Sequence, residues 1–210
     1  MSNLSVILCN PQHPGNIGAI SRAMTNFGYT QLVLVRPPDG WRDNDELKRL
    51  ANGYVQALDN AVVIDSLAEL VESYSGLIGF TRRSGSRRPI LGNLDDAAEH
   101  LSSAENARQI GLVFGNERTG LTQTEIECCD SLYTIETTQE SGSLNLSLAA
   151  SLVMYELAKA RRSLNVFAND LSNQPATLAV GEEVLGCTQS ILLCWQEAGL
   201  HDPIRHQRSY

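Results

Sequence analysis

The chain has 210 residues, 42% of them hydrophobic, which is enough for one substantial domain and a smaller appendage. Its formal net charge of −8 argues against a uniformly basic surface for nucleic acid, but this whole-chain average leaves room for a local basic patch. No apolar run approaches the ~20 residues that a membrane-spanning helix needs, so the sequence offers no candidate for such a helix.

Short apolar runs alternate with segments of helical periodicity along the first 162 residues. The runs predicted as strands are 4–9, 31–35, 61–64, 77–80, 109–114 and 132–135. The segments predicted as helices are 17–27, 45–52, a short one capped by Asp65 or Ser66, and the longest, 144–162. Alternation of this kind predicts an α/β fold, in which a mostly parallel sheet is flanked by helices on both faces.

Two helix boundaries carry local signals. Gly28 follows the first predicted helix at the position where a left-handed glycine commonly ends a helix. Ser66 and Glu69 are three residues apart, which is the spacing of a capping box at a helix start.

The C-terminal part of the chain differs in character from the first 162 residues. Residues 163–180 are polar, contain Asn, Ser and Pro, and lack a clear period, which is typical of a linker. Residues 182–199 then have the pattern of one amphipathic helix within a C-terminal extension, residues 181–210. A lone helix has no core of its own, so we expect this one to pack against another surface.

The five cysteines and four histidines show no metal-binding spacing. The cysteines form no C-x-x-C pair, the histidines form no H-x-x-x-H pair, and no signal peptide precedes the first strand. We therefore expect reduced thiols in a cytoplasmic protein without a metal. Cys187 and Cys194 are seven residues apart, and we expect them to be small buried side chains on one helix face.

Three polar, glycine-containing loops follow predicted strands, at the carboxyl ends where ligands bind in open α/β sheets. The first, residues 10–22, opens into a helix whose N-terminus favours an anion. The second, residues 114–121, holds two glycines around a Glu-Arg pair. The third, residues 140–148, has more N-cap-type residues than one helix start needs, which indicates side chains available to a ligand. Taken alone, each of the first two loops is also explained as a turn with solvated surface charges.

A fourth loop concentrates positive charge in this acidic chain. Arg82, Arg83, Arg87 and Arg88 lie within seven residues, after the strand predicted over 77–80. The arginine fork suits bidentate phosphate contacts, so the loop is a candidate for binding a polyanion; the alternative is a solvated exposed loop. The sequence lacks G-x-G-x-x-G after the first strand, G-x-x-x-x-G-K-[ST] and G-x-S-x-G, which disfavours an ordinary dinucleotide site, a P-loop and a nucleophile elbow.

Three motifs in these loops resemble the ordered motifs of the SpoU/TrmH family, a branch of the SPOUT RNA methyltransferases. They are N-x-G-x-x-x-R with Asn16, Gly18 and Arg22, then L-V-F-G-N-E-R-T-G-L at residues 112–121, then S-L-N-L-S at residues 143–147. Three motifs in this order and spacing are far more specific than any one of them. The run at residues 13–28 is most similar to family members that methylate cytidine or uridine at nucleotide 32 of tRNA.

The resemblance covers about residues 4–162 and implies a SPOUT fold, in which the C-terminal part of a methyltransferase domain, residues 1–162, threads into a trefoil knot. It also implies a homodimer whose active sites take residues from both subunits, with S-adenosylmethionine as cofactor and tRNA as substrate. The implied reaction moves a methyl group to a ribose 2′-oxygen, at nucleotide 32 of the anticodon loop. Residues 181–210 are shorter than the extension expected for the family, which suggests a truncated extension.

The resemblance also assigns roles to single residues. Arg22 corresponds to the catalytic arginine, and because a guanidinium stays protonated we expect it to grip the target phosphate and stabilise the developing alkoxide. Ser143 and Asn145 are expected to orient the ribose and the methionyl end of the cofactor, and Glu117 to hold Arg22 or a loop amide. Asn16 completes this catalytic set. The expected cofactor-binding residues are Thr81, Arg82, Arg83, Gly115, Ile135, Gly142, Ser143, Leu144 and Asn145. The expected RNA-binding residues are Arg22, Arg82, Arg83, Arg87 and Arg88.

Three alternatives fit the same motifs less well. The first is a 2′-O-methyltransferase of the same family that acts on ribosomal RNA or on the wobble nucleotide of tRNA. The second is a catalytically silent RNA-binding dimer on the same scaffold, which the intact motif residues disfavour. The third is a small-molecule enzyme with an unusual nucleotide site, which the acidic charge favours and the arginine loop disfavours.

Overall fold

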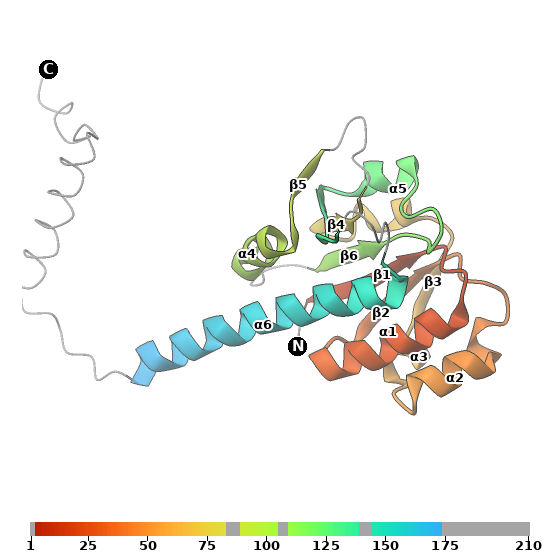
Figure 1. The fold of residues 1–210 in the computed structure, drawn as a ribbon, viewed down its shortest axis with the longest axis horizontal. Coiled ribbons are helices and arrows are strands. Elements are labelled where there is room, and N and C mark those ends of the chain that lie inside the picture. Colours follow the sequence, from red (N-terminus) through yellow and green to blue (C-terminus); the bar gives the residue numbers. More distant parts are fainter. Residues whose placement is uncertain (1–2, 83–88, 105–108, 139–143, 174–210) are drawn as a thin grey trace, which may run out of the picture. The chain divides into compact units, whose positions relative to one another are not determined.

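The computed structural model describes residues 3–82, 89–104, 109–138 and 144–173. Within these residues the chain forms one sheet of seven strands, in which all neighbouring strands pair in parallel. The strand order is β3-β2-β1-β6-β4-β7-β5, so the chain starts in the middle of the sheet (Figure 1). The strands are β1 (Leu4–Cys9), β2 (Gln31–Val35), β3 (Val62–Ile64), β4 (Gly76–Phe80), β5 (Ile90–Gly92), β6 (Ile110–Phe114) and β7 (Ser131–Tyr133).

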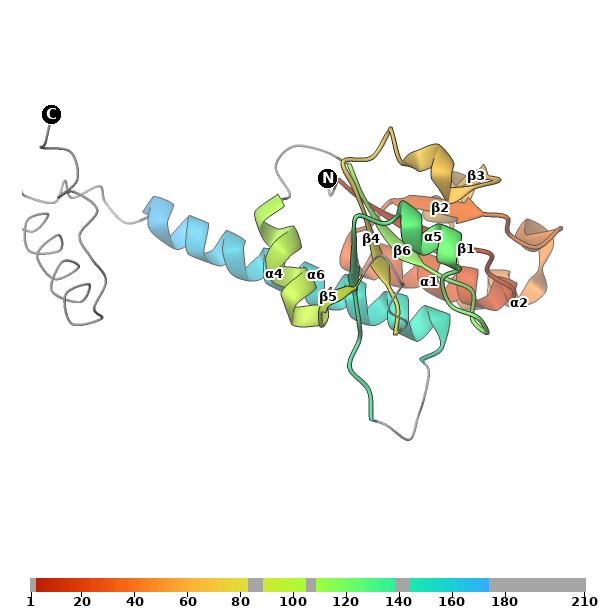
Figure 2. The ribbon, with the colours of Figure 1, turned by 90° about the horizontal axis from the view of Figure 1, so that it is seen from above.

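Helices cover both faces of this sheet (Figure 1; Figure 2). The α-helices are α1 (Pro14–Phe27), α2 (Asp45–Ala51), α3 (Gln56–Asp59), α4 (Leu94–Ala104), α5 (Gln123–Cys128) and α6 (Leu146–Asn173), and the short 3-10 helices are η1 (Trp41–Asp43) and η2 (Leu67–Leu70). Buried side chains of α1, α2, α3, α4 and α6 form one hydrophobic cluster with the strands. Those of η2 and α5 form a second cluster on the other face.

The strand β1 shows why both faces are covered. Leu4, Val6 and Leu8 belong to the first cluster, whereas Ile7 and Cys9 belong to the second. Side chains alternate between the two faces of a strand, so a strand with apolar side chains on both faces must be buried on both. The predicted α/β fold, a parallel sheet flanked by helices, is confirmed.

The helices α1 and α2 approach each other closely at Gly18. A Cβ atom on Gly18 would lie 2.3 Å from the carbonyl oxygen of Leu47, and one on Gly15 would lie 2.8 Å from Cδ of Glu46. The Leu47 contact is with backbone, which cannot rotate away, so a side chain at position 18 would push the two helices apart. Gly18, a residue of the first motif, therefore serves helix packing.

Several predicted boundaries differ slightly from the structure. The helix α1 begins at Pro14 and not at Ile17, because proline is well tolerated in the first helical turn. It ends at Phe27, and the capping residue Gly28 has a φ of +80°, in the left-handed region that the sequence predicted. The capping box of Ser66 and Glu69 is present at the start of η2. Five elements, η1, α3, β5, α4 and α5, have no counterpart among the predicted ones.

The helix α6 is longer than predicted. It continues through Asn173, so residues 163–173, which were expected to lie in a linker, are helical. These residues include polar side chains but no glycine and no proline before Pro175, so nothing breaks the helix after Arg162. The chain divides into two compact units, residues 1–165 and 166–210. The helix predicted over 182–199 lies outside the described residues, and the trefoil knot stays a prediction.

The cysteines that the structure describes are free thiols. Cys9 and Cys129 are buried, and Cys128 is partly exposed. Burial raises the pKa of the Cys9 thiol, and the nearby Glu125 carboxylate raises it further. Over the described ranges there is no cluster of three or more His, Cys, Asp or Glu residues suited to a metal ion. None of the helices in those ranges combines the length and apolar character needed to cross a membrane.

Candidate active site

Three loops meet at the carboxyl ends of β1 and β6 and at the start of α6, and Glu117 joins the first two. Its Oε2 accepts a hydrogen bond from the backbone N–H of Gln12, at 2.9 Å. Its Oε1 accepts from the backbone N–H of His13, at 3.2 Å, and from Nδ2 of Asn16, at 2.9 Å. Glu117 thus fixes the loop after β6 against the loop after β1.

Asn145 connects the third loop to the first. Its Nδ2 donates to Oδ1 of Asn16, at 3.2 Å. Its Oδ1 accepts from the backbone N–H groups of Ser147, at 2.8 Å, and Leu148, at 3.3 Å, which is the pattern of a helix N-cap. One amide therefore both caps α6 and contacts the first loop. We call this set the Glu117 network: Glu117, Asn16, Asn145 and the backbone amides of Gln12 and His13.

The first loop does bind an anion, and this anion is a side chain of the protein. The Glu117 carboxylate lies on the two amides just before α1, where the sequence predicted an anion. Partial burial raises the pKa of the Glu117 carboxyl, but hydrogen bonds from Asn16 and the backbone amides outweigh burial and hold the pKa below its ordinary value of 4.5. The carboxylate is therefore ionised at neutral pH, and the two amides are not left for a ligand.

This lowered pKa predicts a pH-dependent contribution of Glu117 to stability. Because the pKa is lowered in the folded protein, ionised Glu117 stabilises the fold above its unfolded-state pKa, and the stabilisation is lost as the pH falls through the lower folded-state pKa. We expect the difference in the free energy of unfolding between wild type and Glu117→Gln to shrink as the pH is lowered from about 7 to about 3. Urea unfolding followed by circular dichroism measures this difference.

The exposed carboxylate Glu72 provides the matched control, because Glu72→Gln removes a charge from the surface without touching the three loops. If the difference in the free energy of unfolding between wild type and Glu117→Gln stayed constant over the same pH range, the hydrogen bonds assigned to the Glu117 carboxylate would be contradicted.

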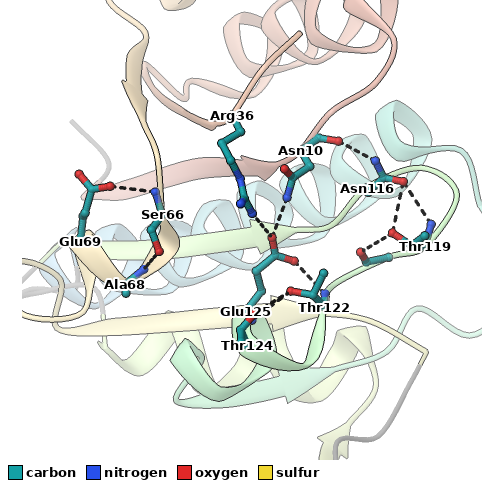
Figure 3. A network of polar contacts seen from close by, with 11 residues as sticks. Asn10, Arg36, Ser66, Ala68, Glu69, Asn116, Thr119, Thr122, Thr124 and Glu125 are labelled. Carbon is teal, nitrogen blue, oxygen red and sulfur yellow. Dashed lines mark hydrogen bonds and ion pairs between the residues drawn. The ribbon is translucent and has the colours of Figure 1, made fainter.

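A buried carboxylate on α5, Glu125, braces the same two loops (Figure 3). Its Oε1 accepts from Nδ2 of Asn10, at 2.9 Å, and lies 3.8 Å from a guanidinium nitrogen of Arg36. Its Oε2 accepts from the backbone N–H of Thr122, at 2.8 Å, as part of the capping box that starts α5. The Asn10 carbonyl in turn accepts from Nδ2 of Asn116, at 2.7 Å. Glu125 thus holds the first loop at its start and the second loop at its end.

A cavity of about 400 Å³ lies beside the second loop, at the carboxyl ends of β4 and β6 and the start of α6. Its volume is typical of sites for small ligands and cofactors. The structure brings five residues from the expected cofactor site together around it: Thr81, Arg82, Gly115, Ile135 and Leu144. Phe80 and Phe114 also line it, with their rings stacked at 5.3 Å between centroids. Phe114 belongs to the second motif, whereas no sequence motif pointed to Phe80.

At Gly115 the cavity is lined by backbone atoms without a side chain. A Cβ atom there would lie 2.1 Å from the backbone N of Leu121 and 2.2 Å from the backbone carbon of Gly120. The loop folds back on itself through an antiparallel bridge between Asn116 and Gly120, which brings these backbone atoms close. Only glycine fits at position 115, and its backbone is accessible to a ligand at short distance.

Arg22 lies on the exposed side of α1. It makes no hydrogen bond or ion pair with any residue in the described ranges, and it is not among the residues that line the cavity there. Of the two partners expected for Glu117, Arg22 or a loop amide, the structure shows the loop amide.

Five of the expected site residues fall outside the part of the chain that the structure describes. They are Arg83, Arg87, Arg88, Gly142 and Ser143. Their roles in binding cofactor, ribose or RNA stay predictions. Arg82, their neighbour, is described and lines the cavity.

Comparison of the sequence with known proteins gives the family. Residues 3–155 match the SpoU rRNA Methylase family. Over 163 residues the chain is 38% identical to the tRNA (cytidine/uridine/adenosine-2'-O-)-methyltransferase TrmJ of Pseudomonas aeruginosa, and the alignment covers 76% of this chain and 62% of that protein. The chain thus spans about 62% of the length of this curated relative.

Solved structures show the same likeness. The crystal structure of TrmJ from Z. mobilis ZM4 matches with a TM-score of 0.66 and 30% identity, over 96% of this chain and 83% of that one. A probable methylase family protein from Haemophilus influenzae matches with a TM-score of 0.71 and 28% identity, over 96% of this chain and 82% of that one. The motifs, the parallel sheet and these matches agree, and the chain belongs to the SpoU rRNA Methylase family.

Proposed function

We propose that this chain is an S-adenosylmethionine-dependent ribose 2′-O-methyltransferase of tRNA that acts at nucleotide 32 of the anticodon loop. The observation that carries the proposal is the Glu117 network, which joins residues of all three family motifs close to one cavity. The similarity to a protein named as a tRNA 2'-O-methyltransferase extends over 163 residues, 76% of this chain.

The cavity fits S-adenosylmethionine in size and in chemistry. Phe80, Phe114 and Ile135 offer apolar surface to the adenine, while Thr81 and the bare backbone at Gly115 suit its polar groups. When bound, this cofactor supplies an electrophilic methyl group on a positively charged sulfur.

The chain's own residues would position the nucleophile and stabilise its charge. Arg22 presents an exposed guanidinium cation, so it can hold the phosphate beside the target ribose and stabilise the negative charge that develops on the 2′-oxygen. Asn16 and Asn145 are fixed by Glu117 and by the N-cap before substrate binds, which reduces the reorganisation that catalysis requires. Ser143 is proposed to orient the ribose with them.

The proposal includes a homodimer in which each active site takes residues from both subunits. The position of Arg22 supports this arrangement, because Arg22 is absent from the described lining of the cavity in its own chain. The Arg22 of one protomer would then act at the cavity of its partner.

The test is transfer of labelled methyl groups from S-adenosylmethionine to unmodified tRNA transcripts, followed by mapping of each 2′-O-methyl group to its nucleotide. We expect label at nucleotide 32. The matched control is a transcript with a single 2′-deoxyribose at nucleotide 32, which lacks the acceptor oxygen and should take up no label. Label at the wobble nucleotide or on ribosomal RNA would overturn the choice of substrate, and an absence of both transfer and cofactor binding would overturn the function.

A further inference from the structure

A second cavity, of about 490 Å³, lies on the surface between α1 and α3. Its walls include Thr25 of α1, Tyr54 from the turn after α2, and three polar residues at α3: Gln56, Asp59 and Asn60. It shares no described lining residue with the cavity beside Gly115. The family motifs and the proposed cofactor site give it no role.

Tyr54 is held rigidly by its backbone while its side chain stays exposed. Asn52 and Gly53 both have positive φ, +48° and +81°, so the chain reverses sharply just before Tyr54. The Tyr54 N–H donates to the Ala51 carbonyl, at 2.9 Å, and its carbonyl accepts from the hydroxyl of Ser21, at 2.6 Å. The residue is nevertheless 41% exposed. An aromatic ring on a fixed backbone loses little freedom when a flat ligand stacks on it.

The proposed catalytic arginine lies next to this cavity. Arg22 directly follows Ser21, whose hydroxyl holds the Tyr54 carbonyl. Arg22 and Thr25 are three residues apart on α1, so they are neighbours on the helix surface, and Thr25 lines the cavity. An RNA strand with a phosphate on Arg22 would therefore have its bases within reach of Tyr54.

The polar groups of the cavity suit a nucleobase better than a phosphate. The described lining contains an Asp59 carboxylate and the amides of Gln56 and Asn60, but no lysine or arginine. A carboxylate repels phosphate and accepts hydrogen bonds from the amino groups of bases, and an amide both donates and accepts. An aromatic ring with such side chains around it is how proteins recognise unstacked bases of single-stranded RNA.

We infer that this cavity binds an unstacked nucleobase of the RNA strand beside the target nucleotide, with the base stacked on Tyr54. The inference rests on the proposed function in one respect, that Arg22 meets RNA. The cavity at Tyr54 would be a site that recognises a base and takes no part in methyl transfer to the 2′-oxygen.

The test measures RNA binding, which does not depend on methyl transfer. We expect Tyr54→Ala to weaken the binding of a fluorescently labelled tRNA anticodon arm to the 210-residue protein by about 10-fold, and Tyr54→Phe and Tyr54→Trp to stay within about 2-fold of wild type because the ring is kept. Val71→Ala is the matched control, because Val71 is 48% exposed at the end of η2, on the other face of the sheet. Binding of S-adenosylmethionine and thermal unfolding should be unchanged in Tyr54→Ala.

Photocrosslinking locates the base directly. An anticodon arm that carries 4-thiouridine in its loop should crosslink to a peptide containing Tyr54 in the wild type. This inference would be overturned if Tyr54→Ala bound RNA as tightly as the wild type and no such crosslink formed. If methyl transfer still depended on Arg22 in that case, the proposed function would remain supported. Dissociation of Tyr54→Ala into monomers on size-exclusion chromatography would also overturn this inference, since the cavity would then bind a second copy of the chain. If the wild type neither binds RNA nor transfers methyl groups, both this inference and the proposed function are overturned.

Discussion

Replacement of Arg22 by alanine is expected to reduce methyl transfer to tRNA by at least about 100-fold. The side chain is exposed and makes no hydrogen bond or ion pair within the described ranges, so its removal breaks no polar contact there. Under the proposed function, the variant loses the positive charge that would hold the phosphate and stabilise the developing 2′-alkoxide. Turnover at saturating tRNA and S-adenosylmethionine measures the effect, and circular dichroism confirms that the variant is folded.

Two further variants show that the effect belongs to Arg22. Arg22→Lys keeps the charge but lacks the planar fork, so we expect turnover between those of wild type and alanine. Arg49→Ala removes an exposed arginine from α2, where its partner is Glu46 at 3.7 Å, and should turn over at nearly the wild-type rate. If Arg22→Ala turned over at close to the wild-type rate, the catalytic role proposed for Arg22 would be contradicted.

Gly115→Ala is expected to abolish binding of S-adenosylmethionine and to lower the free energy of unfolding by about 1–3 kcal/mol. The added Cβ would meet the backbone of Gly120 and Leu121 at 2.2 Å and 2.1 Å, so the loop must shift as a whole. A shifted loop changes the cavity wall and strains the antiparallel bridge between Asn116 and Gly120. Isothermal titration calorimetry measures cofactor binding, and urea unfolding measures stability.

The comparison for Gly115→Ala is Gly40→Ala. Gly40 has a φ of +67°, and an added Cβ would meet nothing within 4 Å, so the variant suffers backbone strain of about 1–2 kcal/mol without a steric clash. It should bind S-adenosylmethionine as the wild type does, because Gly40 is not among the described lining of the cavity. Wild-type cofactor affinity in folded Gly115→Ala would show that this backbone is not part of the binding wall.

The central strands could be predicted because their apolar side chains must be buried on both faces of a sheet. β1, β2 and β6 are short, mostly apolar runs between turn residues, and burial on both faces accounts for this composition. The helix α4 also carries a readable signal, since Leu94, Ala97, Ala98 and Leu101 recur at helical spacing. β5 has three residues and an irregular register with β7, so its sequence holds no comparable signal.

The candidate site could be predicted in outline but not in its contacts. The family resemblance assigned Thr81 and Gly115 to one cofactor site, and both line the same cavity because loops that follow parallel strands share one edge of the sheet. The spacing of motifs in a sequence does not fix the direction in which a side chain points. The partner of Glu117, Arg22 or a loop amide, could therefore be identified only from the structure. The end of α6 was misplaced for a related reason, because polar residues alone do not stop a helix.

The Glu117 network has a consequence for the order in which the protein is built. Its hydrogen bonds join residues that are 101 to 129 positions apart in the chain, so closing them costs much chain entropy and depends on a sheet that is already formed. During synthesis the first loop leaves the ribosome well before Glu117 and Asn145. We therefore expect β1, α1 and β2 to become compact early, and the three loops to assemble only once residue 145 has emerged. A nascent chain would thus carry no finished site with which to capture tRNA.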